Sequence, residues 1–169
     1  MLQTPPAASD ATLLERNTAL LAALDGLLAG ERDAIANMAN TAALLFGMLA
    51  ELNWVGFYRW RGPWPGGELV VGPFQGKPAC VRIAPGRGVC GTAAASRQTQ
   101  LVPDVHAFDG HIACDPASRS ELVVPLIGAQ GVLGVLDLDS PRPGRFDAGD
   151  AQLLEAVARR LVAGCDWPA

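Results

Sequence analysis

Residues 120–139 read SELVVPLIGAQGVLGVLDLD, two apolar runs joined by the segment GAQG. Each run has the length and the branched side chains typical of a β-strand, and the glycine-flanked connection predicts an antiparallel hairpin. Glu121, Asp137 and Asp139 are the exceptions to the apolar character of the two faces. A strand that is apolar on both faces belongs to a sheet that is covered on both sides. The hairpin therefore predicts a central sheet between two covering layers.

The three acids of this hairpin raise a question of register. Asp137 and Asp139 are two residues apart on a strand, so their side chains point to the same face. If the loop has two or four residues and the register is regular, Glu121 faces Leu138 and points to the opposite face. Clustering all three acids needs an odd-numbered loop, a β-bulge or diagonal contacts.

Helical and extended patterns surround the hairpin. Apolar residues at helical spacing predict long helices over about 9–28, over about 32–52, and from an N-cap at Asp147 to about 163. A short helix is expected at 89–97, and further strands are expected at 54–60, 68–74, 79–84 and 100–105.

These elements predict an α+β fold. It consists of a single domain over residues 9–169, with an antiparallel sheet flanked by helices and an N-terminal helical segment over about 9–52. Residues 1–8 are rich in proline and alanine, and we expect this N-terminus to be loose.

Composition narrows the class of protein. The chain has 169 residues, of which 50% are hydrophobic, so one domain can bury a core. The formal net charge of −4 argues against a nucleic-acid partner. Glycine, asparagine or charged residues interrupt the apolar runs before they reach membrane-spanning length. Because the N-terminus also lacks the basic and apolar regions of a secretory signal, we expect a cytoplasmic protein.

The chain has four cysteines, Cys80, Cys90, Cys114 and Cys165. In a cytoplasmic protein a disulfide is rare unless it is catalytic or redox-sensing. Cys80 and Cys90 have apolar neighbours, and a core thiol is the ordinary interpretation of such a cysteine. Cys114 stands next to Asp115 in a polar loop, where a core position is harder to explain. Cys165, near the end of the last predicted helix, is expected to have no chemical role.

Residues 104–117 form a long loop that holds Cys114 and both histidines, His106 and His111. Loops of this length without regular structure are often functional. A zinc site that combined His111 and Cys114 with the two upstream cysteines is one alternative, although the chain lacks the CxxC pair typical of structural zinc sites. Otherwise we expect both histidines to be ordinary loop residues, and no bound metal.

Three parts of the chain carry a family resemblance: NWVGFYRW at 53–60, LVVGPFQGKPACVRIAPGRGVCGTA at 69–93, and SELVVPL, GVLGVLDLDSP and RFDAGD within 120–150. Together they resemble the GAF family, in which a sheet with helices on one or both sides binds a small molecule. Within that family they resemble the free methionine-(R)-sulfoxide reductases, over about residues 30–163. The resemblance implies an oxidoreductase that reduces free L-methionine-(R)-S-oxide to methionine without a cofactor.

The resemblance also implies roles for the cysteines. Cys114 would attack the sulfoxide and become a sulfenic acid. Cys80 would be the main resolving residue, which converts the oxidised form to an intramolecular disulfide, and Cys90 would be a second or alternative resolving residue. Thioredoxin would then reduce the disulfide. The sequence leaves open whether the chain acts alone or as a homodimer.

For the substrate pocket the resemblance implies three acids, Glu121, Asp137 and Asp139, and an aromatic wall of Trp54 and Tyr58. Reduction of a sulfoxide needs a soft nucleophile at sulfur and a proton at oxygen. Like charges raise one another's pKa, so one clustered acid is expected to keep a proton, and we favour Glu121 as the donor. The other two acids would face the ammonium group of the substrate, which methionine inside a peptide has lost.

Two other classes of protein fit parts of this pattern. A non-catalytic GAF domain that senses a small ligand would use the same pocket without redox cysteines, and a structural zinc module would use the cysteines as ligands. Taken on their own, Trp54 and Tyr58 on a strand are ordinarily core residues, and Asp137 and Asp139 near a strand end ordinarily belong to a solvated turn. The three internal cysteines favour the enzyme.

Overall fold

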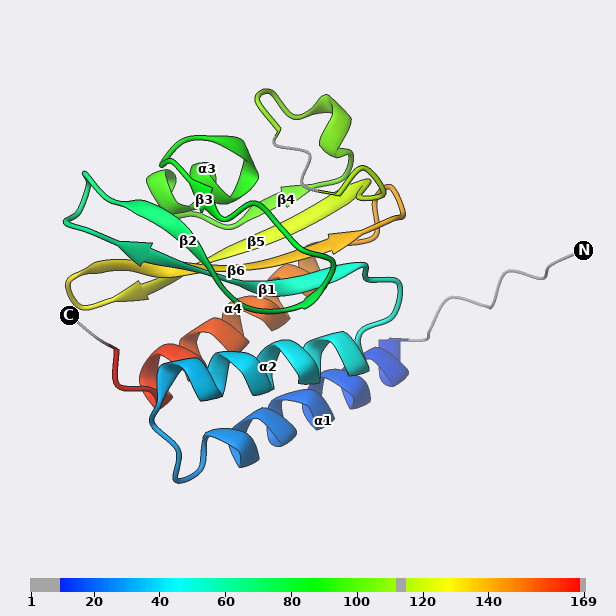
Figure 1. The fold of residues 1–169 in the computed structure, drawn as a ribbon. Helices are drawn as coiled ribbons and strands as arrows, with labels where there is room; N and C mark the ends of the chain where they lie inside the picture. Colours follow the sequence, from blue (N-terminus) through cyan, green and yellow to red (C-terminus); the bar gives the residue numbers. More distant parts are fainter. Residues whose placement is uncertain (1–9, 112–114, 168–169) are drawn as a thin grey trace, which may run out of the picture.

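A single antiparallel sheet of six strands lies at the centre of the computed structural model, which describes residues 10–111 and 115–167 (Figure 1). The strands are β1 (Trp54–Arg61), β2 (Glu68–Gly76), β3 (Arg82–Ile83), β4 (Gln100–Val102), β5 (Ser120–Gly128) and β6 (Gly131–Ser140). Their order across the sheet is β3-β2-β1-β6-β5-β4, so the β5–β6 hairpin lies directly beside β1. The predicted α+β architecture is confirmed.

Three long helices cover one face of this sheet: α1 (Asp10–Leu28), α2 (Ala34–Met48) and α4 (Ala148–Gly164) (Figure 1). The apolar sides of α2 and α4 pack against the strands, and α1 packs on these two helices, in a core where Leu20, Leu45 and Leu138 are fully buried. Asp147 caps α4 as predicted, because its side chain accepts a hydrogen bond from the Asp150 N–H (2.9 Å) and Asp150 accepts one from the Asp147 N–H (3.2 Å). This reciprocal cap satisfies donors that a helix start leaves unpaired.

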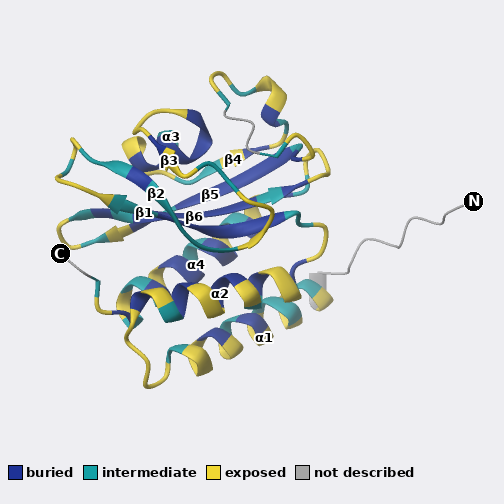
Figure 2. Ribbon diagram, in the orientation of Figure 1, coloured by how far each residue is buried: buried dark blue, intermediate teal, exposed yellow. Residues whose placement is uncertain are grey.

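The short helix α3 (Gly88–Ser96) lies against the opposite face, together with the segments that precede β3 and β5 (Figure 1). A second apolar cluster forms here and includes Trp54, Tyr58, Val89 and Val123. The central strands are consequently buried along most of their length, as their dark blue colour shows (Figure 2). A sheet covered on both sides is therefore confirmed. None of the helices in the described ranges is both long and apolar enough to cross a lipid bilayer.

The β5–β6 hairpin contains a bulge. Leu126 pairs with Gly134, and the next residue of β5, Ile127, pairs with Val132. Leu133 of β6 therefore has no partner on β5. Gly134 suits this position because a Cβ atom here would collide with the backbone carbonyl oxygen of Tyr58 on β1. Glycine allows neighbouring backbones to approach this closely. The bulge thus lies next to a close contact between β6 and β1.

The bulge decides which way the three acids face. Beyond an extra residue in one strand, each residue of the partner strand pairs with a residue one position further along. Side chains that would have pointed to opposite faces then point to the same face. Glu121 consequently pairs with Asp139, whereas a regular register would have placed it opposite Leu138. Asp137, two residues before Asp139, points to the same face. All three carboxylates therefore lie under α3.

Helix α2 is shorter than predicted. It ends at Met48, whereas the apolar pattern predicts an end near residue 52. Leu49 is already extended, and its N–H makes a last hydrogen bond to the Leu45 carbonyl oxygen (2.9 Å). Glu51 then has a φ of 64°, which is outside the helical region. Because Leu49 still packs into the core after the helix has ended, the apolar pattern overestimates the length of the helix.

Strand β3 is also shorter than predicted, since within the expected range 79–84 only Arg82–Ile83 pairs with β2. Pro78 and Pro85 flank the segment, and a proline has no N–H to donate to a ladder. Cys80 therefore lies in a connecting segment and not on a strand. The described part of the predicted loop over 104–117 contains one short 3-10 helix, η1 (Val105–Ala107).

The importance of the bulge can be tested with Gly134→Ala. We expect this variant to lose about 2 kcal/mol or more of unfolding free energy, because the added Cβ meets a backbone oxygen that has no room to move. Gly26→Ala on α1 is the matched control, since nothing lies within 4 Å of a Cβ at that position. Urea unfolding measures both variants. If Gly134→Ala unfolds with the same free energy as Gly26→Ala, the backbones of β1 and β6 can move apart at Gly134 without a loss of stability.

Candidate active site

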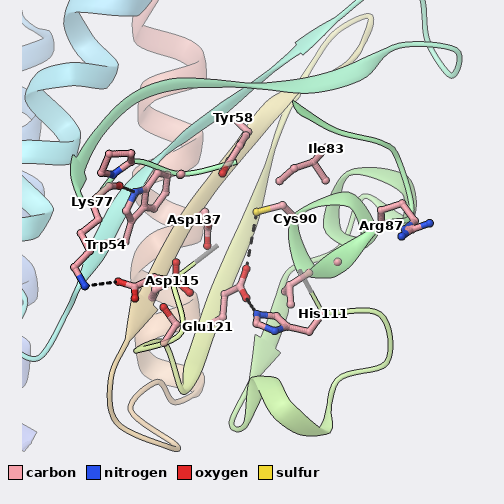
Figure 3. A pocket seen from close by; sticks show the side chains of 16 residues that line it. Trp54, Tyr58, Lys77, Ile83, Arg87, Cys90, His111, Asp115, Glu121 and Asp137 are labelled. Carbon is pink, nitrogen blue, oxygen red and sulfur yellow. Dashed lines mark hydrogen bonds and ion pairs between the residues drawn. The ribbon is translucent and has the colours of Figure 1, made fainter. Parts of the chain in front are cut away.

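A pocket opens on the face of the sheet under α3 (Figure 3). Strands β1, β5 and β6 form its floor, α3 forms a wall, and the segments before β3 and before β5 form its rim. The lining includes predicted site residues from all of the floor strands and from α3: Trp54, Tyr58, Glu121, Asp137, Asp139 and Cys90. The fold thus brings together the acids, the aromatic residues and one of the cysteines that the sequence singled out.

The three carboxylates form the polar part of the floor. Glu121 and Asp137 are almost fully buried, with 6% and 5% of their surfaces exposed. Burial raises the pKa of Glu121 well above its usual value, and the charge of Asp139 raises it further. Burial and Glu121 raise the pKa of Asp137, and burial and Asp137 raise the pKa of Asp139. The pocket therefore favours bound protons or a bound cation over three unpaired negative charges.

Asp137 has an oxygen atom without a hydrogen-bond partner. Its Oδ1 atom is buried, and no donor among the described residues reaches it. Leaving a buried acceptor unsatisfied costs about 1–3 kcal/mol. A ligand that brought a donor or a positive charge to this atom would recover that free energy.

The Cys90 thiol lies beside the acids. Cys90 is 4% exposed, and its Sγ atom is 3.9 Å from Glu121 Oε1, within reach of a hydrogen bond donated by the thiol (Figure 3). Burial raises the pKa of this thiol well above its usual value, and the charges of Asp137 and Glu121 raise it further. Cys90 therefore keeps its proton at neutral pH and is a weak nucleophile. Its Sγ atom and one oxygen each of Glu121 and Asp137 lie within 4.8 Å of one another, a spacing that could hold a metal ion.

Trp54 and Tyr58 form an apolar wall next to the acids. Their ring centroids are 5.9 Å apart, and Trp54 also stacks on Phe74 with centroids 5.3 Å apart. The Trp54 indole N–H donates to the Lys77 carbonyl oxygen (3.1 Å), which fixes the ring against the rim. Burial raises the pKa of Tyr58, and Asp137 raises it further, so the hydroxyl keeps its proton. Such a wall suits a ligand with an apolar group next to a positive charge.

The rim contains polar residues that the sequence analysis missed. Lys77 Nζ lies 3.5 Å from Asp115 Oδ2, and Asn53 donates a hydrogen bond to the same oxygen (3.2 Å). His111, predicted to be an ordinary loop residue, has its Nε2 atom 3.6 Å from Glu121 Oε2 (Figure 3). Burial lowers the pKa of His111, so its imidazole is neutral at neutral pH. These residues come from irregular segments. The length of the loop over 104–117 was a signal for His111 and Asp115, and the sequence held no such signal for Lys77 and Asn53.

The remaining cysteines differ in their positions. Cys114, predicted to be the attacking residue, lies outside the described residues and precedes Asp115 of the rim in sequence. Cys80 is disulfide-bonded and partly buried, and Pro78, two residues earlier, lines the pocket. Cys165 carries a free thiol and packs in the helical core on the opposite face of the sheet. The roles predicted for Cys80 and Cys114 stay predictions.

Known proteins resemble this chain over most of its length. Residues 20–163 match the GAF domain family. The free methionine-R-sulfoxide reductase of Escherichia coli (strain K12) is 53% identical to this chain over 137 residues, which cover 81% of this chain and 81% of that protein.

Solved structures match the whole domain. The free methionine-R-sulfoxide reductase from Neisseria meningitidis, in complex with its substrate, has a TM-score of 0.84 and 43% identity, covering 97% of this chain and 95% of that chain. A putative GAF sensor protein from Burkholderia vietnamiensis has a TM-score of 0.84 and 55% identity, covering 94% and 96%. The chain therefore belongs to the GAF domain family and, within it, to the free methionine-R-sulfoxide reductases.

Proposed function

We propose that the protein reduces free L-methionine-(R)-S-oxide to methionine. The observation that carries this proposal is the cluster of buried Glu121 and Asp137 with partly buried Asp139, beside the wall of Trp54 and Tyr58. A free amino acid offers an ammonium group to the carboxylates and a methyl sulfoxide to the aromatic rings. The names of the relatives from E. coli and N. meningitidis, and the substrate bound to the latter, support this assignment.

The acids account for a preference for the free amino acid. An ammonium group at the floor would supply the donor and the positive charge that Asp137 Oδ1 lacks. Methionine sulfoxide inside a peptide carries a neutral amide in place of this ammonium group. It would leave the buried carboxylates without a counter-charge, and its neighbouring residues would have to enter a covered pocket.

Cys114 is the proposed nucleophile. Its thiolate attacks the sulfoxide sulfur while the oxygen takes up a proton, and transfer of the oxygen to the cysteine releases methionine and leaves a Cys114 sulfenic acid. The Cys80 thiol then attacks the sulfur of the sulfenic acid, whose hydroxyl group leaves as water with the proton of the thiol. The disulfide between Cys80 and Cys114 is finally reduced by thioredoxin, whose two thiols are oxidised in turn.

The states of the other cysteines support this pairing. The chain has four cysteines. Cys90 and Cys165 carry free thiols, whereas Cys80 is disulfide-bonded. The proposal makes Cys114 the partner of Cys80. Because its raised pKa keeps Cys90 protonated, the Cys90 thiol is poorly suited to attack a sulfenic acid, and we assign resolution to Cys80.

Glu121 is the proposed proton donor. Its raised pKa favours the protonated carboxyl, which is the form that a general acid requires. Neutral His111 lies on its outer side and the Cys90 thiol on its inner side, so no fixed positive charge stabilises the ionised form among the described residues in contact with it. Asp137 and Asp139 are then left to face the ammonium group.

The cysteine assignments predict three different kinetic behaviours. Cys114→Ser should abolish turnover of free methionine sulfoxide with the fold intact, because a hydroxyl is a much weaker nucleophile toward sulfur than a thiolate. Cys80→Ser should release one equivalent of methionine quickly and then stall. Cys165→Ser, the control in the helical core, should turn over at the wild-type rate. A thioredoxin-coupled assay and a rapid-quench assay distinguish these outcomes, and full recycling by Cys80→Ser would assign resolution to Cys90.

Recognition of the ammonium group predicts strict selectivity. For N-acetylmethionine sulfoxide, kcat/KM should be about 30-fold or more below that of the free amino acid, which corresponds to the loss of a buried charge pairing of about 2 kcal/mol. In Asp139→Asn the ratio of kcat/KM for the free substrate to kcat/KM for the N-acetylated substrate should be smaller, because this variant has already lost one partner of the ammonium group. Comparable kcat/KM values for both substrates in the wild type would contradict the assignment.

Proton donation by Glu121 predicts a pH dependence. A raised pKa means that the carboxyl is protonated below that pKa, so the rate of methionine formation should fall as pH rises through it. Glu121→Gln should lower kcat and flatten this fall, whereas Asp139→Asn should mainly raise KM. Single-turnover rates over a pH series measure both effects. A wild-type kcat in Glu121→Gln would transfer the donor role to another acid of the pocket.

A further inference from the structure

The Cys90 thiol has no step in the proposed reaction, yet it lines the pocket and only 4% of the residue is exposed. Cys90 on α3, Glu121 on β5 and Asp137 on β6 each direct one potential ligand atom to the same small volume (Figure 3). These atoms lie within 4.8 Å of one another, and all three residues are buried. They form the one such group found within residues 10–111 and 115–167.

The spacing of these atoms suits a tetrahedral metal ion. Zinc binds sulfur at about 2.3 Å and carboxylate oxygen at about 2.0–2.2 Å, which places its ligand atoms about 3.3–3.8 Å apart. Cys90 Sγ and Glu121 Oε1 are already 3.9 Å apart, so a small side-chain movement completes this edge of the tetrahedron. A thiolate with two carboxylates also matches the ligand types that zinc accepts.

A second feature of this site, an unpaired oxygen that the proposed function assigns to the substrate ammonium group, also suits a metal cation. The Oδ1 atom of Asp137 is buried and has no hydrogen-bond partner among the described residues, although Asp137 is only 5% exposed. Native proteins rarely leave such an acceptor without a partner. A metal ion next to Cys90 and Glu121 would supply a positive charge to the same buried carboxylate.

We propose that Cys90, Glu121 and Asp137 form a binding site for a zinc-like divalent cation. On binding, the Cys90 thiol loses its proton to solvent and becomes the sulfur ligand, and each carboxylate contributes one oxygen. The fourth position faces the pocket and is left to water. No redox change accompanies binding, so the ion enters and leaves by ligand exchange alone.

Such an ion would compete with the amino-acid substrate, a consequence that rests on the proposed function. It would occupy the Asp137 carboxylate that we assign to the ammonium group, and it would remove the Glu121 proton that we assign to the sulfoxide oxygen. Zn²⁺ should therefore inhibit turnover, and a higher concentration of methionine sulfoxide should relieve the inhibition. The site would make the enzyme sensitive to free zinc.

Cobalt spectroscopy tests the site without any turnover. The oxidised protein, in which thiol titration should find two free thiols, is titrated with Co²⁺, and a cobalt–thiolate charge-transfer band in the near ultraviolet is expected. Cys90→Ala should abolish the band, whereas Cys165→Ala, which removes the other free thiol, should retain it. Asp137→Asn should weaken Co²⁺ binding about 10-fold or more, and this variant serves if Cys90→Ala fails to fold. Added Zn²⁺ should displace the cobalt and bleach the band.

Two results would overturn the proposal: a wild-type protein that shows no charge-transfer band at saturating Co²⁺, or a band that persists in Cys90→Ala. An inhibition assay separates this site from the proposed function. If the band depends on Cys90 but methionine sulfoxide does not relieve zinc inhibition, the metal site stands and the assignment of the ammonium group to Asp137 fails.

Discussion

The pocket depends on one constraint, the confinement of three carboxylates close together and away from water. Burial and mutual repulsion push Glu121, Asp137 and Asp139 toward their protonated forms, so the site attracts protons and cations before any ligand arrives. The bulge at Leu133 turns the acids to one face, and α3 covers that face. On the opposite face α2 and α4 pack against the strands, and α1 packs on these two helices.

Much of the fold could be predicted from the sequence, because its strongest signals are local. The hairpin and the N-cap at Asp147 follow from side-chain type and spacing alone, and the structure has both. The end of α2 could not be predicted, because Leu49 continues the apolar pattern although its backbone is extended. The bulge that sets the register of β6 lies next to the close approach of Gly134 to the Tyr58 carbonyl oxygen, and these two residues are far apart in the sequence.

The site was predictable where its residues lie on regular elements. Acids and aromatic residues on strands of an apolar sheet are unusual enough to be noticed, and once the register is known their common face follows from alternation. Lys77 and His111 reach the pocket from irregular segments, so their positions depend on loop packing that no periodic pattern describes. The protonation state of Cys90 likewise required the structure, since it arises from burial beside two acids on other strands.

Strand β6 carries two functions at alternate positions. Asp137 and Asp139 face the pocket, whereas Leu136 and Leu138 pack against the helices. Substitutions at the first set can therefore change ligand preference while the second set keeps the domain folded. Insertion or deletion of one residue between Gly134 and the aspartates would turn each side chain to the other face of the sheet. The leucines would then face the pocket, and the carboxylates would face the helical core. Descendants of this domain are thus free to diverge in side chains and in rim-loop length, but the length of this strand is fixed.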